Sequence, residues 1–184
     1  MKYVALFRGI NVGGKNIVKM NDLTQLLLDL GLNKVKTYIQ SGNAVFESIL
    51  DEECLQEEIQ TGFTKRFGFQ SNVMIRSVDE ISTLIDQLPF SVEEIAVAEA
   101  ADPQVVHLYV YFLDHLPEET QINAICKEYD GADILRTGQR EVYLLCHQSV
   151  RNSKLATRFV KVFSSTTARN WKTVNKLYEM MTNL

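Results

Sequence analysis

Residues 35–46, VKTYIQSGNAVF, decide the fold class, because they form two strand-like runs on either side of a tight turn. The runs 35–39 and 44–46 are rich in β-branched and aromatic side chains, and the Ser41-Gly42 pair between them is a hairpin signal. An isolated hairpin is not stable in water, so the elements before and after it determine the sheet that it joins.

A strand and a helix precede this hairpin. Residues 2–7, KYVALF, are a short apolar run that predicts a buried strand, and Arg8-Gly9 closes it. Asn21 is placed to cap a helix that Gly31 ends. The apolar side chains of this helix recur at helical spacing, at Leu23, Leu26, Leu27 and Leu30.

A second helix and another strand follow the hairpin. Asp51 is a typical N-cap and Gly68 a typical C-terminal residue, and the helix between them starts acidic and ends basic. Residues 73–75 predict a short strand, and residues 77–80 form a capping box for a further helix that Pro89 stops. The order is therefore βαββαβ, which is typical of a ferredoxin-like α+β sandwich.

The second half of the chain repeats this order in pattern. A strand over 105–113 is followed by a helix with Pro117 at its first position, which Gly131 ends. Two strands then surround Gly138, and two helices complete the chain. We therefore predict two ferredoxin-like βαββα(β) subdomains in tandem plus a C-terminal helix. The predicted bounds are 1–88 for the first subdomain, 89–104 for a linker, and 105–184 for the second subdomain with its C-terminal helix.

Charge is unevenly distributed along the chain. The formal net charge is -4, but residues 1–40 carry +4, residues 41–149 carry -14, and residues 150–184 carry +6. Both ends are basic and the middle is acidic, so the ends are the parts of the chain that would attract an anionic partner.

The cysteines and the apolar runs indicate a cytoplasmic protein. Cys54, Cys126 and Cys146 form a sparse, odd set, which argues against a disulfide framework and for a reducing compartment. No signal-peptide pattern opens the sequence, and no apolar run approaches the length of a membrane span. We therefore expect cytoplasmic localisation and no association with a membrane.

Two polar loops are the leading candidate site. In a ferredoxin-like sheet the first and third strands are adjacent and antiparallel, so the loop after residue 7 meets the turn before residue 43. Cationic and neutral donors beside a helix N-terminus suit a phosphate or carboxylate group. The predicted ligand-binding residues are Arg8, Asn11, Gly13, Gly14, Lys15, Gln40, Ser41 and Asn43. Arg8 and Lys15 would supply charge, and Asn11, Ser41 and Asn43 would orient a nucleotide or a phosphorylated metabolite.

A structural role for the same residues is the competing interpretation. Glycines also make tight turns, asparagine side chains also satisfy backbone groups, and Arg8 could pair with a carboxylate of the acidic middle. Residues 9–15 also imitate a P-loop, but Asn16 stands where a P-loop carries the Ser or Thr that binds magnesium, and the helix begins too late.

The C-terminal segment holds a second polar cluster, with Thr167, Arg169, Asn170 and Lys172 as the candidate patch. Helix capping and packing of Trp171 explain most of it, but its cations could also form a basic face. Two alternatives to the small-ligand hypothesis therefore stay open. One is nucleic-acid binding through the basic ends, and the other is a structural homodimer in which basic ends meet an acidic middle.

No catalytic chemistry can be assigned from the sequence. The histidines share no metal-ligand spacing, and no motif of a hydrolase or a zinc site occurs. We therefore predict no metal site and no cofactor, and we name no catalytic residue.

Three separated blocks resemble one bacterial family. They are RGINVGG at residues 8–14, TYIQSGN at 37–43, and TARNWKTV at 167–174, supported by Met20, Leu23, Phe46 and Leu177. In these blocks the chain resembles the family named domain of unknown function 1697. The resemblance implies a small cytoplasmic α/β protein and carries no established activity.

Overall fold

The computed structural model describes all 184 residues, which group into two compact units. The first unit consists of Met1–Ile85 and Asn175–Leu184, and the second of Asp86–Val174. Each unit contains a four-stranded antiparallel sheet and its helices. The predicted fold class, two tandem ferredoxin-like subdomains with a C-terminal helix, is confirmed. None of the helices combines the length and apolar character that a membrane span requires.

In the first unit the sheet has the strand order β2-β3-β1-β4, with β1 antiparallel to both of its neighbours. Its strands are β1 (Lys2–Phe7), β2 (Asn33–Tyr38), β3 (Asn43–Glu47) and β4 (Val73–Ser77). Its helices are α1 (Met20–Asp29), α2 (Glu52–Phe67) and α3 (Val78–Asp86).

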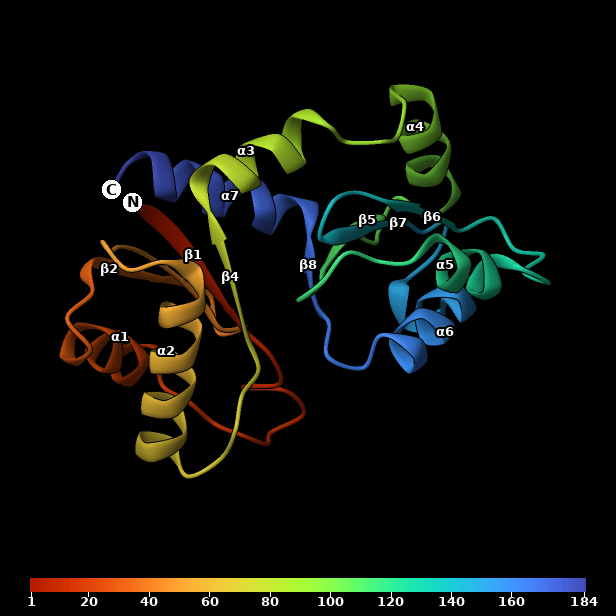
Figure 1. Ribbon diagram of the computed structural model, residues 1–184. Coiled ribbons are helices and arrows are strands. Elements are labelled where there is room, and N and C mark those ends of the chain that lie inside the picture. Colours follow the sequence, from red (N-terminus) through yellow and green to blue (C-terminus); the bar gives the residue numbers. More distant parts are fainter. The chain divides into compact units, whose positions relative to one another are not determined.

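Helices α1 and α2 cover one face of this sheet (Figure 1). Helix α2 begins and ends as the sequence predicts, because the Asp51 carboxylate accepts from the Cys54 amide at 2.9 Å and Gly68 adopts the left-handed conformation. Phe63 of α2 packs its ring against that of Phe7 of β1, with centroids 5.3 Å apart. Burial of such a side chain stabilises a fold by roughly 1.5–3 kcal/mol.

The second unit has the equivalent strand order β6-β7-β5-β8, and α5 and α6 cover one face of its sheet (Figure 1). Its strands are β5 (Leu108–Phe112), β6 (Ile134–Thr137), β7 (Glu141–Leu145) and β8 (Thr167–Asn170). Its helices are α4 (Val92–Ala101), α5 (Glu119–Cys126), a 3₁₀ turn (Val150–Asn152) and α6 (Lys154–Val162), and α7 (Trp171–Thr182) starts in this unit.

Helix α4 forms inside the segment that the sequence assigns to a linker. Ser91 and Glu94 make a complete capping box, with the Ser91 amide donating to the Glu94 carboxylate at 2.9 Å. The Arg136 guanidinium holds this carboxylate from β6, with its two nitrogens 2.6 and 2.9 Å from the two oxygens. Capping and this bidentate ion pair explain why a stretch of small apolar and acidic residues is ordered as a helix.

Strand β8 is also missing from the sequence prediction, which ends the second subdomain at βαββα. Residues 167–170, TARN, pair antiparallel with β5, from Phe112 opposite Thr167 to Tyr109 opposite Asn170. This strand completes the second βαββαβ order. Its polar composition gives no local strand signal, so pairing with the central strand determines its conformation.

Two helix starts differ from the prediction. Helix α1 begins at Met20 with Lys19 as its N-cap, so Asn21 lies inside the helix instead of capping it. Helix α5 begins at Glu119, so Pro117 precedes the N-cap Glu118. Neither N-cap side chain accepts a capping hydrogen bond, which explains why the usual signals mislead here.

The last ten residues group with the first unit, whereas the sequence assigns the whole C-terminal helix to the second subdomain. Specific polar contacts account for this. Ser82 of α3 donates to the Tyr178 hydroxyl at 3.1 Å, and the Lys2 ammonium donates to the Thr182 carbonyl at 2.9 Å. The boundary between the units therefore falls within α7.

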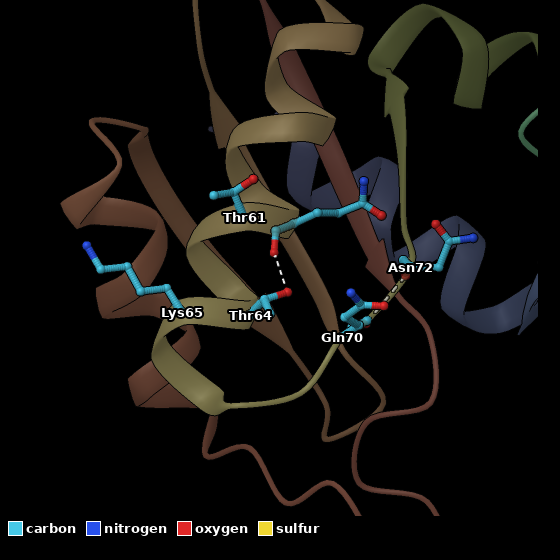
Figure 2. Close-up of a pocket in the computed structure, with 7 residues that line it drawn as sticks. Thr61, Thr64, Lys65, Gln70 and Asn72 are labelled. Carbon is cyan, nitrogen blue, oxygen red and sulfur yellow. Dashed lines mark hydrogen bonds between the residues drawn. The ribbon is translucent and has the colours of Figure 1, made fainter.

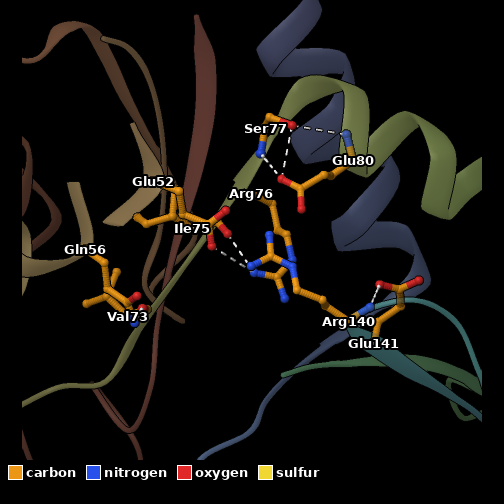
Figure 3. Close-up of polar contacts among 9 residues, drawn as sticks. All are labelled: Glu52, Gln56, Val73, Ile75, Arg76, Ser77, Glu80, Arg140 and Glu141. Atoms are coloured by element: carbon orange, nitrogen blue, oxygen red, sulfur yellow. Dashed lines mark hydrogen bonds and ion pairs between the residues drawn. The ribbon is translucent and has the colours of Figure 1, made fainter. Parts of the chain in front are cut away.

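A buried arginine marks the same position of the edge strand in each unit. In β4, Arg76 lies opposite Val4 and donates to the carbonyl of Ile75 at 2.7 Å (Figure 3). In β8, Arg169 lies opposite Val110 and donates to the carbonyl of the preceding residue at 2.8 Å. In each edge strand the arginine thus hydrogen-bonds a backbone carbonyl that faces outward. This makes the edge less able to pair with a strand of another chain.

The residue after each arginine caps the helix that follows. Ser77 and Glu80 form a reciprocal capping box at the start of α3, with bonds of 2.9 and 3.2 Å between side chains and amides (Figure 3). The Asn170 amide oxygen accepts from the Thr173 amide of α7 at 2.8 Å. The two units therefore share both the register and the transition from strand to helix.

Candidate functional site

The two loops that the sequence predicts to converge do lie together. The Phe7 amide at the end of β1 donates to the Gly42 carbonyl at 2.8 Å. The Asn11 side-chain amide donates to the Gln40 carbonyl at 2.9 Å. Residues 8–15 and residues 40–43 thus form one surface at this end of the first sheet.

Asn11 holds the shape of the first loop. Its Nδ2 also donates to the Val18 carbonyl at 2.9 Å, and its Oδ1 accepts from the Val18 amide at 2.8 Å. Its backbone has a φ of 54°, in the left-handed region that asparagine tolerates better than most residues. The Asn11 side chain therefore joins the two ends of the loop from residue 11 to residue 18.

Asn43 and Ser41 build the hairpin turn instead of facing a ligand. Asn43 is fully buried at the start of β3, and its Nδ2 donates to the Tyr38 carbonyl at 3.0 Å and to the Ser41 hydroxyl at 2.9 Å. Asn11, Ser41 and Asn43 therefore orient the protein's own backbone and the hairpin turn. This is what the competing, structural interpretation of these residues expects.

The cations of the first loop remain exposed. Neither the Arg8 guanidinium nor the Lys15 ammonium lies within ion-pair distance of a carboxylate. The amides of Gly13 and Gly14, with φ values of 59° and 75°, donate no hydrogen bond within the chain. Positive charge and unpaired amides at a glycine pair are the groups that a protein offers to an anion.

Ser71 and Asn72 also support the loop, although the sequence reasoning did not single them out. The Arg8 amide donates to the Asn72 carbonyl, and the Ser71 hydroxyl donates to the Arg8 carbonyl, both at 2.9 Å. The fold topology contained the signal, because β4 runs antiparallel to β1 and its first residues must lie beside the end of β1.

The loop is not a P-loop. Residues 12 and 15 form an isolated antiparallel bridge, and α1 begins five residues after Lys15. A P-loop lysine instead lies at the start of its helix, where the helix amides surround the phosphates.

The C-terminal candidate patch is mostly structural. Thr167 and Arg169 are buried, and the Arg169 guanidinium donates to the Thr167 hydroxyl at 2.9 Å. Burial lowers the pKa of Arg169 to about 10, so the side chain stays charged at neutral pH. Asn170 caps α7, which leaves Lys172 as the exposed cation of the patch.

The structure holds no group of three or more His, Cys, Asp or Glu side chains placed to bind a metal ion. The three cysteines are free thiols, and they differ in exposure from Cys54, which is exposed, to Cys146, which is buried.

We expect a thiol reagent such as DTNB to label Cys54 first in the native protein at pH 8. Burial raises the pKa of Cys146 to about 12, so this thiol is almost entirely protonated there and also inaccessible. A hydrogen bond with Asp51 raises the pKa of Cys54, so its labelling is slower than that of a free thiol. The Cys54→Ser variant should lose the first phase, whereas all three thiols should react in urea. A fast phase that persists in Cys54→Ser would contradict this order.

Comparison with known proteins places the chain in a family. No curated protein matches it. The solved structure of the conserved bacterial protein SP0830 from Streptococcus pneumoniae is similar over 98% of both chains, with 28% sequence identity and a TM-score of 0.74. The sequence pattern of the family described as "Protein of unknown function (DUF1697)" matches residues 1–143, which include both converging loops. The chain therefore belongs to the DUF1697 family.

Proposed function

We propose that the first unit binds a small anionic ligand, a nucleotide or a phosphorylated metabolite, on the loop of residues 8–15. The observation that supports this most strongly is the combination of two exposed cations without carboxylate partners and the unpaired amides of Gly13 and Gly14. The Arg66 guanidinium, for comparison, lies 2.7 Å from the Asp29 carboxylate in the same unit.

The rigidity of the loop supports the same proposal. The bonds of Asn11 to Val18 and Gln40 hold the loop in shape before any ligand arrives. A preformed site loses less conformational freedom on binding than a flexible loop does. In this proposal Arg8, Lys15 and the loop amides contact the anion, and Asn11, Ser41 and Asn43 position them.

Titration with inorganic phosphate, pyrophosphate and ATP, followed by calorimetry and by the amide NMR signals of Gly13 and Gly14, tests the proposal. We expect at least one of these anions to bind and to shift both signals. Arg8→Ala and Lys15→Ala should each weaken binding by about tenfold to a hundredfold, because a hydrogen bond to a charged group contributes about 1.5–3 kcal/mol.

Arg66→Ala is the matched control, because it removes one positive charge from the same unit outside the loop. Its affinity for the anion should stay within about twofold of the wild type, since exposed charges are screened at physiological salt. The proposal is wrong if none of the three anions binds, or if Arg8→Ala and Lys15→Ala bind as tightly as Arg66→Ala.

We also propose that the protein works in the cytoplasm. The three cysteines, free in the structure, support this, because a reducing compartment keeps such thiols unpaired. Cell fractionation with an antibody to the protein tests the location, and recovery in an extracellular fraction would contradict it.

A further inference from the structure

A polar groove of about 680 Å³ lies on the first unit, between α2 and the segment that joins α2 to β4 (Figure 2). Gln60, Thr61, Thr64 and Lys65 line it from the helix, and residues 70–72 line it from the segment. Its volume is within the range of small-molecule sites, and it includes none of the residues of the loop at 8–15.

The walls of the groove are fixed by hydrogen bonds to the backbone. The Thr64 hydroxyl donates to the Gln60 carbonyl at 2.8 Å, and the Gln60 side-chain oxygen accepts from the Val73 amide at 3.3 Å. The Ser71 hydroxyl donates to the Arg8 carbonyl at 2.9 Å. The groove is therefore held in shape by both the helix and the sheet.

Several neutral polar groups in the groove have no partner within the chain. They are the Gln60 Nε2, the Thr61 hydroxyl and the Gln70 side-chain amide. A hydroxyl group can both donate and accept a hydrogen bond. In a side-chain amide the nitrogen donates and the oxygen accepts. A ligand rich in hydroxyl groups matches these unpaired donors and acceptors, because each hydroxyl can both donate and accept a hydrogen bond.

The charge of the lining favours a neutral ligand over an ionic one. No carboxylate lines the groove, so no negative charge there attracts a cation. Lys65 is the one cation in the lining, and in Figure 2 its ammonium points away from Gln70 and Asn72. A ligand between α2 and residues 70–72 would therefore meet neutral groups.

Two other ligand classes do not fit. No aromatic ring lines the groove, so a nucleobase would have nothing to stack on. A peptide strand cannot pair with the edge at Val73, because the Gln56 side chain donates to its carbonyl at 3.0 Å and Gln60 accepts from its amide.

We propose that this groove binds a neutral, hydroxyl-rich small molecule, a sugar or a polyol. Thr61 and Gln70 contact the ligand hydroxyls from the two sides of the groove, and the Gln60 Nε2 donates to a third. The lining shares no residue with the anion-binding loop, although Ser71 and Asn72 hydrogen-bond the backbone of Arg8. The two proposals use different ligand-contacting side chains, so either can be correct without the other.

NMR titration of the ¹⁵N-labelled full chain with glucose, maltose and myo-inositol tests the proposal. At least one of these should shift the side-chain amide signals of Gln60 and Gln70 in a saturable way. The signals of Gly13 and Gly14 should not move. Thr61→Val and Gln70→Leu should each weaken binding about threefold to tenfold, because each removes neutral hydrogen bonds of about 0.5–1.5 kcal/mol.

Gln148→Leu is the matched control, because it removes an exposed glutamine from the second unit and should leave the affinity unchanged. Amide spectra of the unliganded variants establish that each is folded, which is expected since Thr61 and Gln70 are exposed. The proposal fails if none of the three compounds gives saturable shifts at Gln60 and Gln70, or if the groove variants bind like Gln148→Leu. Shifts of these signals by inorganic phosphate alone would also overturn it, since the groove would then be an anion site.

Discussion

Gly42→Ala is expected to lower the free energy of unfolding by about 2–5 kcal/mol, measured by urea denaturation followed by circular dichroism. Gly42 has a φ of 75°, where a side chain costs roughly 1–2 kcal/mol. A Cβ there would also lie 2.7 Å from Ile10 Cδ1 and 2.9 Å from Phe7 Cβ. Both neighbours are buried, so relief of this overlap requires displacement of the core and costs about 1–3 kcal/mol more.

Gly31→Ala separates these two costs. Gly31 has a similar φ of 81°, but a Cβ there would have no atom within 4 Å. We expect this variant to show only the conformational cost, about 1–2 kcal/mol. Equal losses of stability at the two glycines would mean that the overlap of a Cβ at Gly42 with Ile10 and Phe7 adds nothing to the destabilisation.

Phe63→Ala is expected to destabilise the protein by about 3–5 kcal/mol in the same measurement. Phe63 is fully buried, and its ring lies 5.3 Å from that of Phe7, 4.7 Å from that of Phe67 and 5.3 Å from that of Phe69. Removal of the ring leaves a cavity that fixed neighbours on α2 and β1 cannot fill.

Phe67→Ala is the control for the loss of Phe63. Phe67 lies one turn later on α2 and is only partly buried, so the same substitution should cost less. A loss of less than about 1 kcal/mol for Phe63→Ala, or a larger loss for Phe67→Ala, would show that the core is not centred on Phe63.

The elements that the sequence predicts correctly are those with strong local signals. Helix α2 combines a capping aspartate, charges that suit the helix dipole, and a terminal glycine, and all of these function as expected. The hairpin of β2 and β3 is likewise specified by the pair Ser41-Gly42. The topology of the first sheet follows from the order of these elements, which is why the convergence of the two loops could be predicted.

The sequence prediction misses two elements for different reasons. Strand β8 consists of polar residues and becomes a strand because β5 pairs with it. Helix α4 had a readable capping box at Ser91 and Glu94, but the flanking prolines favoured a linker. The lesson from α4 is that a complete capping box is stronger evidence than the composition around it.

The contact between the two loops was predictable from the sequence, whereas the hydrogen bonds of Asn11 and Asn43 within them were not. Sequence and topology placed the two loops together, but the tasks of Asn11 and Asn43 depend on which backbone groups need partners. Those groups are known only once the loop conformation is known. The same limit applies to the groove beside α2, whose residues 60–65 and 70–72 have no distinctive motif.

The matching arginines of β4 and β8 bear on how this chain arose. Arg76 and Arg169 each lie opposite a valine of the central strand, and each precedes the residue that caps the next helix. Duplication and fusion of one ancestral βαββαβα unit would account for this agreement. A descendant of the unduplicated ancestor would carry, at the end of its last strand, an arginine followed by a serine or an asparagine.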